Sequence, residues 1–203
     1  MGLPTAATGV VFSLIYVFVA RSVTQFGTPA LAALGIGHRV ESWLYMVGVG
    51  FGAATAAIVG QNLGAGRLDR AERAGWIATG FCTALGVVFC VLELWIPERF
   101  ASVFANDPAV ISEGAKYLRI AAVSQLAVCA EIVLEGALGG AGHTVAPMLS
   151  STAITVSRIP LAAWAASRWG SVGIWWVISL TAIARALAMI ALWRAGGWKR
   201  KSV

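Results

Sequence analysis

Two glutamates, Glu131 and Glu135, lie four residues apart in a stretch of the chain that is otherwise apolar. On a helix this spacing places both carboxylates on one face, within about 6 Å of each other. Two like charges in a low-dielectric environment do not both ionise readily, so the pair is expected to titrate as a coupled unit. One member would then hold a proton near neutral pH and could exchange it. Glu131 and Glu135 are therefore candidates for a proton- or cation-coupling site.

Three arginines also lie within apolar stretches, and they give Glu131 an alternative role. Charges are costly inside hydrocarbon, so each of Arg39, Arg158 and Arg185 is a candidate intramembrane charge partner. A pair between Glu131 and one of these arginines would hold helices together rather than move a cation. For Glu135, which is closer to the end of its apolar stretch, the alternative is exposure to water.

The sequence context of two of these arginines favours structural roles. Arg39 and Glu41 are two residues apart and so do not face each other on a helix, which favours a structural or interfacial role. Arg158 precedes Pro160, whose missing N–H donor favours a kink in the local helix. Such a kink could be purely structural or could serve a conformational change.

Other motifs give no sign of an enzyme or of a metal site. Residues 60–66, GQNLGAG, resemble a phosphate-binding loop only superficially, because no Lys-Ser/Thr follows. The chain has neither an HExxH nor a GxSxG motif. The three cysteines, Cys82, Cys90 and Cys129, have no metal-ligand spacing and are expected to be packing residues. We therefore expect no enzyme activity and no cofactor other than a coupling proton or sodium ion.

The composition indicates that these residues are positioned by membrane helices. Charged residues make up 12% of the chain and hydrophobic residues 59%, with a mean hydropathy of +0.80. A soluble domain carries roughly 25% charged residues. Residues 3–20, 42–66 and 74–92 contain no charge at all. In lipid the backbone must satisfy its own hydrogen bonds, so continuous apolar runs of this length predict an all-α, polytopic membrane protein.

Six transmembrane helices in a single lobe account for the pattern of apolar runs. They are predicted over residues 4–20, 30–62, 74–95, 115–138, 148–167 and 172–193. Six crossings place both termini on one side of the membrane, and that side holds more basic residues than the other. By the positive-inside rule both termini are cytoplasmic in a multi-pass protein of the cell's inner (plasma) membrane. The basic residues on this side are Arg67, Arg70, Arg73, Arg194, Lys199, Arg200 and Lys201, against Arg21, Arg99, Lys116, Arg119 and Arg168 on the other.

The net charge of +6 does not indicate binding to nucleic acid. Basic residues sit at helix ends and in short loops, without a basic face interleaved with aromatic side chains. The nine tryptophans fit better as anchors at the membrane interface, for example Trp43, Trp95, Trp169 and Trp198.

Several motifs, taken in order along the chain, are similar to those of a known family. The first group runs from Ala32-Ala33 through His38-Arg39-Val40 and Ala53-Ala54-Thr55 to residues 59–66, VGQNLGAG, and Arg70-Ala71. The second is residues 139–144, GGAGHT, followed by Pro147-Met148. The third is residues 158–162, RIPLA, followed by Gly173-Ile174-Trp175. Together they resemble the multidrug and toxin extrusion (MATE) family, over nearly the whole chain.

This resemblance implies a fold and a function. MATE transporters have two six-helix lobes around a central cavity, and these motifs correspond to the second lobe. The family exports organic cations and other amphipathic compounds in exchange for protons or sodium. Its frequent acidic position in the fourth helix of this lobe falls near Val128, one turn before Glu131. The expected partners are membrane lipids, small organic substrates, and either the missing N-terminal lobe or a second copy of the chain. The alternatives are a flippase for lipid-linked intermediates and a non-transporting fragment that needs a partner lobe.

Overall fold

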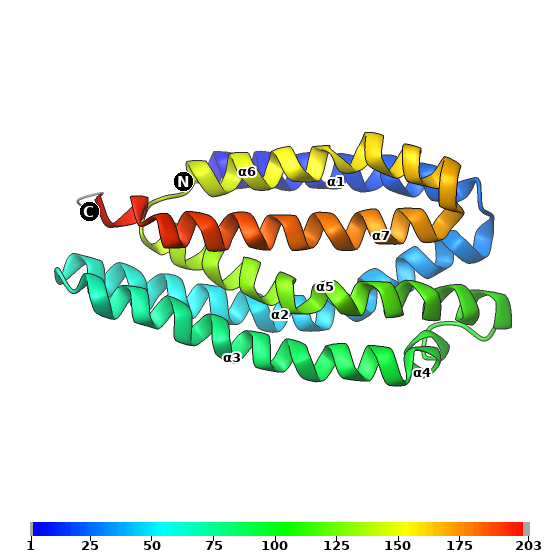
Figure 1. Ribbon diagram of the computed structural model, residues 1–203, viewed down its shortest axis with the longest axis horizontal. Coiled ribbons are helices and arrows are strands. Elements are labelled where there is room, and N and C mark those ends of the chain that lie inside the picture. Colours follow the sequence, from blue (N-terminus) through cyan, green and yellow to red (C-terminus); the bar gives the residue numbers. More distant parts are fainter. Residues whose placement is uncertain (1, 201–203) are drawn as a thin grey trace.

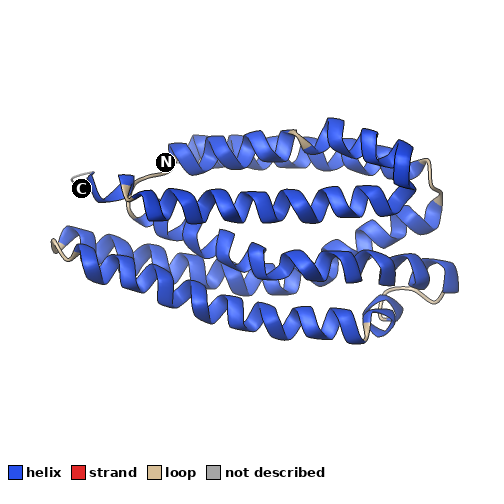
Figure 2. Cartoon of the chain, in the orientation of Figure 1, coloured by secondary structure: helices blue, strands red, loops and turns tan. Residues whose placement is uncertain are grey.

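The computed structural model describes residues 2–200, and almost all of them are helical (Figures 1 and 2). No strand is present in this part of the chain. The prediction of an all-α membrane fold is therefore confirmed. In chain order the helices are α1 Gly2–Thr24, α2 Thr28–Gly64, α3 Leu68–Trp95, α4 Pro97–Ser102, α5 Pro108–Gly140, α6 Val145–Val156, α7 Arg158–Ala195 and the 3-10 helix η1 Gly197–Arg200.

Several helix ends follow directly from residue type. Pro29, Pro97 and Pro108 stand in the first turns of α2, α4 and α5, where a missing N–H costs nothing. At the start of α5 the Asp107 carboxylate accepts a hydrogen bond from the Ala109 backbone N–H at 2.8 Å. The tight turn after α2 has Gly66 at a φ of 70°, a left-handed conformation that glycine adopts without steric cost.

The long helices run roughly parallel or antiparallel in one elongated bundle. Figure 1 shows α1, α6 and α7 along one side of it and α2, α3 and α5 along the other. The segment Val145–Ala195 runs the length of the bundle twice, because it reverses at Gly170, where φ is 64° and ψ is −149°. Both ends of the described chain lie at the same end of the bundle as the α2–α3 turn (Figure 1).

Helices α2 and α5 approach each other closely enough that their backbones touch. A Cβ added at Gly136 would overlap the backbone of Gly52, and one at Gly140 would overlap the backbone of Ala56. Gly48, Gly52, Ala56 and Gly60 follow at every fourth position of α2, the small-residue pattern that lets membrane helices pack closely. This contact fixes α5, the helix that carries Glu131 and Glu135.

The surface and the helix lengths both suit a lipid environment. Four helical segments are long and apolar enough to cross a membrane: Thr28–Gly64, Leu68–Trp95, Pro108–Gly140 and Val145–Ala195. In α1 the stretch Ser13–Thr24 is a shorter apolar helix. Large apolar side chains point outward, among them Met46, Phe81 and Trp95, which is 79% exposed. Of the expected interfacial tryptophans, Trp43, Trp95 and Trp169 are exposed, whereas Trp198 is fully buried against Trp193.

The structure places several helix bounds differently from the sequence-based prediction. The third helix begins at Leu68 rather than near 74, so the connection left between the predicted helices, 63–73, shrinks to the turn 65–67. Charged residues continue the helix there instead of ending it, and Asp69 suits the first turn of a helix. The predicted fourth helix, 115–138, is longer at both ends, and α4 was not predicted. Lys201, counted in the predicted charge bias, lies outside the described residues.

The predicted fifth helix, 148–167, is divided in two. Helix α6 ends at Val156, and α7 begins at Arg158 after Ser157. Pro160 gives the reason, because it has no N–H to donate to the carbonyl group of Val156 four residues earlier. The kink expected at Arg158 and Pro160 is therefore a break between two helices.

Candidate cation-coupling site

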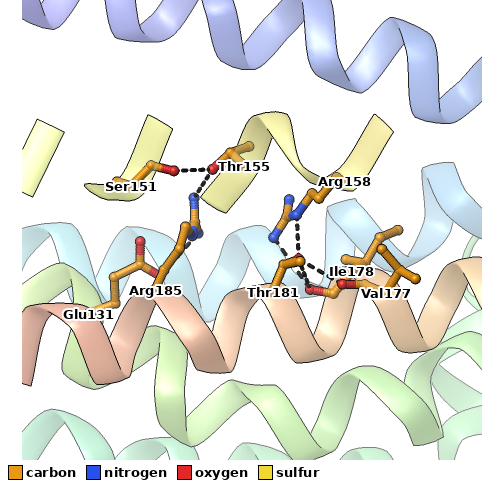
Figure 3. A network of polar contacts seen from close by, with 8 residues as sticks. All are labelled: Glu131, Ser151, Thr155, Arg158, Val177, Ile178, Thr181 and Arg185. Carbon is orange, nitrogen blue, oxygen red and sulfur yellow. Dashed lines mark hydrogen bonds and ion pairs between the residues drawn. The ribbon is translucent and has the colours of Figure 1, made fainter. Parts of the chain in front are cut away.

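Glu131 lies in the interior of the bundle and forms an ion pair with Arg185. Glu131 is 3% exposed, and its Oε2 atom accepts a hydrogen bond from Nη2 of Arg185 at 3.0 Å. Glu131 comes from α5 and Arg185 from the second part of α7, so the pair joins two helices that are far apart in sequence (Figure 3). The structure therefore realises the ion pair that the sequence left as an alternative for Glu131.

The same arginine also reaches α6. Nη1 of Arg185 lies 3.5 Å from the Thr155 hydroxyl oxygen, which accepts this longer contact. The Thr155 hydroxyl donates to the Ser151 carbonyl within α6 at 2.7 Å. Arg185 therefore connects α5, α6 and α7 through one guanidinium group (Figure 3).

Arg158 occupies a neighbouring position in the network. Its Nε donates to the Thr181 hydroxyl at 2.6 Å, and its Nη2 lies 3.4 Å from the Ile178 carbonyl oxygen. Arg158 is 9% exposed and begins α7, so it ties the start of this helix to the part that follows the Gly170 reversal (Figure 3). Thr155 and Arg158 lie on either side of the break between α6 and α7. Thr155 contacts Arg185, and Arg158 contacts Thr181.

The structure separates the other predicted site residues from this network. Glu135 is exposed, one turn along α5 from the buried Glu131. Arg39 is also exposed, and its guanidinium carbon lies 5.9 Å from the centre of the Phe104 ring, so it does not reach Glu131. Of the three candidate arginines, Arg185 contacts Glu131 directly and Arg158 lies nearby.

Two further carboxylates inside the bundle, one half-buried and one fully buried, were not predicted as site residues. Glu41 accepts a hydrogen bond from the Tyr117 hydroxyl, and its other oxygen faces His38. The spacing of His38 and Glu41, three residues apart on an apolar helix, was the available signal. Glu93 is fully buried on α3, and its Oε1 accepts a hydrogen bond from Nε2 of Gln125 at 3.1 Å. It stands directly after the charge-free run 74–92, inside the predicted helix 74–95, and was the one charge in that helix.

The Glu131–Arg185 arrangement suits reversible binding of a proton or a single cation better than the binding of a metal ion by several side chains. Within residues 2–200 no group of three or more His, Cys, Asp or Glu side chains could hold a metal ion. A buried carboxylate paired with a guanidinium is held in place by attraction that strengthens in a low-dielectric interior. Binding a proton or a cation at Glu131 would weaken its attraction to Arg185, and Arg185 also contacts Thr155. A charge change at Glu131 can thereby alter contacts among three helices.

Comparison with known proteins places the chain in a family. The family model described as MatE matches residues 4–164, most of the chain. This chain belongs to the MatE family. The resemblance drawn from the sequence motifs is thereby confirmed, and the chain is an integral membrane protein.

Individual relatives agree with this assignment. The chain is 37% identical to the probable multidrug resistance protein NorM of Deinococcus radiodurans over 156 residues, which cover 74% of this chain and 34% of that protein. It is 33% identical to the probable NorM of Pseudomonas aeruginosa over 208 residues, which cover 98% of this chain and 42% of the relative. The crystal structure of a eukaryotic MATE transporter, AtDTX14, superposes with a TM-score of 0.88 at 19% identity and covers 98% of this chain and 46% of that one. The MatE chain thus spans less than half the length of the relatives it matches.

Proposed function

We propose that this chain forms one lobe of a secondary active antiporter that exports organic cations or other amphipathic drugs in exchange for protons or sodium. The observation that carries the proposal is the Glu131–Arg185 pair, a buried ion pair in the interior of a MatE-family lobe. Ionisable groups within membrane helices are costly and commonly mark ion pathways. The names of its relatives, multidrug resistance proteins, favour drug export over flipping of lipid-linked intermediates.

In this proposal Glu131 is the coupling residue. When a proton or sodium ion neutralises Glu131, the attraction between Glu131 and Arg185 weakens. Arg185 can then shift relative to Thr155, and the contacts between α5, α6 and α7 change together. Loss of the cation restores the pair. Glu135, exposed one turn away, is suited to receive or deliver the cation from water.

The substrate site of the complete transporter requires a second lobe. In transporters built from repeats the substrate binds at the interface between the repeats, so one lobe supplies only one wall of the cavity. The second lobe is either an N-terminal lobe like that of the longer relatives or a second copy of this chain. Expression of this chain alone in a drug-sensitive strain, with cross-linking to detect dimers, tests this part. Drug resistance conferred by a demonstrated monomer would contradict it.

The coupling role is tested with Glu131→Gln in the complete transporter. Glutamine has nearly the same volume as protonated glutamate but cannot release a proton. The variant is expected to reach the membrane in normal amounts and to lose drug export driven by a gradient. Glu98→Gln, an exposed glutamate outside the network, serves as the matched control and should export at the parental rate. Export by Glu131→Gln at the parental rate, under both a proton and a sodium gradient, would contradict the coupling role and leave Glu131 with a structural role only.

We also propose that both termini face the cytoplasm. The turn between α2 and α3 lies at the same end of the bundle as the termini, and Arg67, Arg70 and Arg73 surround it. In a background without Cys82, Cys90 and Cys129, a membrane-impermeant thiol reagent added to intact cells should label Asn106→Cys but not Ala65→Cys. Both positions are exposed in loops, and they lie at opposite ends of the bundle. Labelling of Ala65→Cys alone would reverse the topology.

A further inference from the structure

A second carboxylate inside the bundle, that of Glu41 on α2, has polar partners different from those of Glu131. The Tyr117 hydroxyl of α5 donates to Oε1 of Glu41 at 3.1 Å. The other oxygen, Oε2, lies 3.8 Å from Nδ1 of His38, one turn earlier on the same helix. The Glu41 side chain is 24% exposed, so it keeps some access to the surface, whereas Tyr117 is fully buried.

The rings around Glu41 are fixed by neighbours on two further helices. Tyr16 of α1 packs edge-on against the His38 ring, with 4.7 Å between centroids. Trp175 of α7 packs edge-on against Tyr117 at 4.9 Å. Edge-to-face packing at these distances is a favourable aromatic geometry. Both partners of Glu41 are therefore held in defined positions by helices other than α2.

A small cavity, about 20 Å³ in volume, is lined by residues of both polar clusters. Tyr16 and His38 line it together with Thr155 and Arg158. Thr155 accepts the contact from Arg185, which in turn binds Glu131. Tyr117 and Glu131 are fourteen residues apart on α5, which corresponds to about 21 Å along the helix axis. The two carboxylates therefore lie at different depths in the bundle.

The two carboxylates differ in the group that donates a hydrogen bond to them. The Glu131 carboxylate accepts from the guanidinium of Arg185 at 3.0 Å, and an arginine is charged at every physiological pH. The Glu41 carboxylate accepts from the neutral Tyr117 hydroxyl and faces His38, which is charged only when protonated. A proton on Glu41 therefore does not compete with a hydrogen bond from a guanidinium like the one that Glu131 accepts.

We propose that His38, Glu41 and Tyr117 form a second proton-binding site, in which the partly exposed Glu41 carboxylate takes up one proton from water and later releases it. The proton adds to Oε2 of Glu41 to give the neutral acid, while the Tyr117 hydroxyl remains on Oε1. Its release restores the carboxylate. The site does not require Glu131 to exchange a cation, so it stands apart from the coupling proposal. The titratable and charged groups that face it are Tyr16 from α1, His38 from α2, Glu93 from α3, Tyr117 from α5 and Arg158 from α7.

Infrared difference spectroscopy on the purified chain in lipid nanodiscs tests this inference, because it detects the C=O stretch of protonated carboxylic acids during a pH titration. The parental spectrum is expected to contain the bands of all carboxyl groups that titrate, and the Glu41 component is the difference between the parental and the Glu41→Gln spectra. The same component should appear when Glu131→Gln is compared with the double variant Glu41→Gln, Glu131→Gln. A Glu41→Gln spectrum that matches the parental one, or absence of the Glu41 component in the Glu131→Gln background, would overturn the assignment.

Tyr117→Phe gives a second test that retains the carboxylate and the ring. The tyrosine hydroxyl stabilises the ionised form of Glu41, so its removal should raise the proton affinity of Glu41 about tenfold. Tyr45→Phe is the matched control, because Tyr45 is exposed on α2, the helix that carries Glu41, and it should leave the titration of the Glu41 component unchanged. An unchanged midpoint in Tyr117→Phe would contradict the proposed site. Loss of drug export in Glu131→Gln, or its retention, does not affect either spectroscopic result.

Discussion

Helix α5 packs against α2 and α7 through two seams of different character. In the half of α5 that carries Glu131, the seam with α2 is made of glycine and alanine, and the two backbones touch at Gly52–Gly136 and Ala56–Gly140. The seam with α7 combines apolar packing, such as Tyr117 against Trp175, with the Glu131–Arg185 pair and a hydrogen bond of 3.1 Å from the Ser179 hydroxyl to the Ile120 carbonyl. Near Glu131, α5 is therefore held by a close backbone fit toward α2 and by an ion pair toward α7.

The difference indicates which seam can move. Contacts between backbones depend on a close fit, and a packed interior resists small displacements. Ion pairs and hydrogen bonds can be exchanged for others when a proton, a cation or water arrives. We therefore expect α2 and α5 to move as one unit, and rearrangement to occur where α5 meets α7 and α6.

The largest expected effect comes from removing the positive partner in the polar seam. Arg185→Met leaves the Glu131 carboxylate buried without its guanidinium, and breaking a buried pair in this way costs about 3–5 kcal/mol of unfolding free energy. The free energy can be measured by unfolding in mixed detergent micelles. The double variant Glu131→Gln, Arg185→Met should recover most of the loss, because no charge is then left unpaired.

Arg39→Met is the control for this experiment. Arg39 is exposed and contacts the ring of Phe104, so its replacement should change the unfolding free energy by less than about 1 kcal/mol. Equal losses in the single variant Arg185→Met and in the double variant would show that the pair is not what holds this seam.

A smaller effect of defined sign is expected in the glycine seam. Gly136→Ala should destabilise the bundle by about 1–3 kcal/mol, because the added methyl group overlaps the backbone of Gly52. Gly139→Ala, three residues later on the same helix, has open space around the added methyl group. It should stabilise the helix by up to about 1 kcal/mol, since alanine is the better helix former. Thermal unfolding of both variants in detergent decides the matter, and shifts in the same direction would refute the close α2–α5 contact.

The smallest effect is expected at the surface. Nζ of Lys199 lies 2.6 Å from Oε2 of Glu72, and both side chains are 34% exposed. Exposed ion pairs contribute about 0–1 kcal/mol. Lys199→Ala should therefore change the unfolding free energy by less than about 1 kcal/mol, and high salt should remove the difference. A loss comparable to that of Arg185→Met would mean that charge pairs matter equally in both environments.

The sequence predicted the fold class and the order of the long helices, because apolar length is a property of each segment alone. It did not predict that 148–167 breaks at Ser157, although Pro160 marked the place. A proline alone does not distinguish a kink from an interruption, since the outcome depends on the helices that pack around it. The charged start of α3, residues 68–73, was not predicted to be helical. Charged residues mark the end of an apolar run, but they do not end a helix, which can continue into water.

The candidate site was predicted in its residue types but not in its pairing. Charges in apolar segments pointed to Glu131, Arg158 and Arg185, and all three are buried or half-buried in one network. The spacing of Glu131 and Glu135 suggested a coupled pair, but Glu131 is 3% exposed and Glu135 is exposed to the outside, which is the alternative that the sequence left open for Glu135. Which side of α5 meets α7 depends on the rotation of the helix, and that rotation is set by the glycine contacts with α2.

The 3-10 helix η1 carries a tryptophan whose stacking can be followed by circular dichroism. The indole rings of Trp193 and Trp198 stack in parallel, with 4.2 Å between centroids and 8° between planes, and both are fully buried. Two indoles held so closely in a fixed chiral arrangement couple their electronic transitions and give a paired signal in circular dichroism. Because Trp198 belongs to η1, that signal exists only while η1 is docked on α7. A chain shortened after Ala195, or a fluorescent tag joined too close to Trp198, should therefore erase the signal while leaving the helical far-ultraviolet spectrum intact.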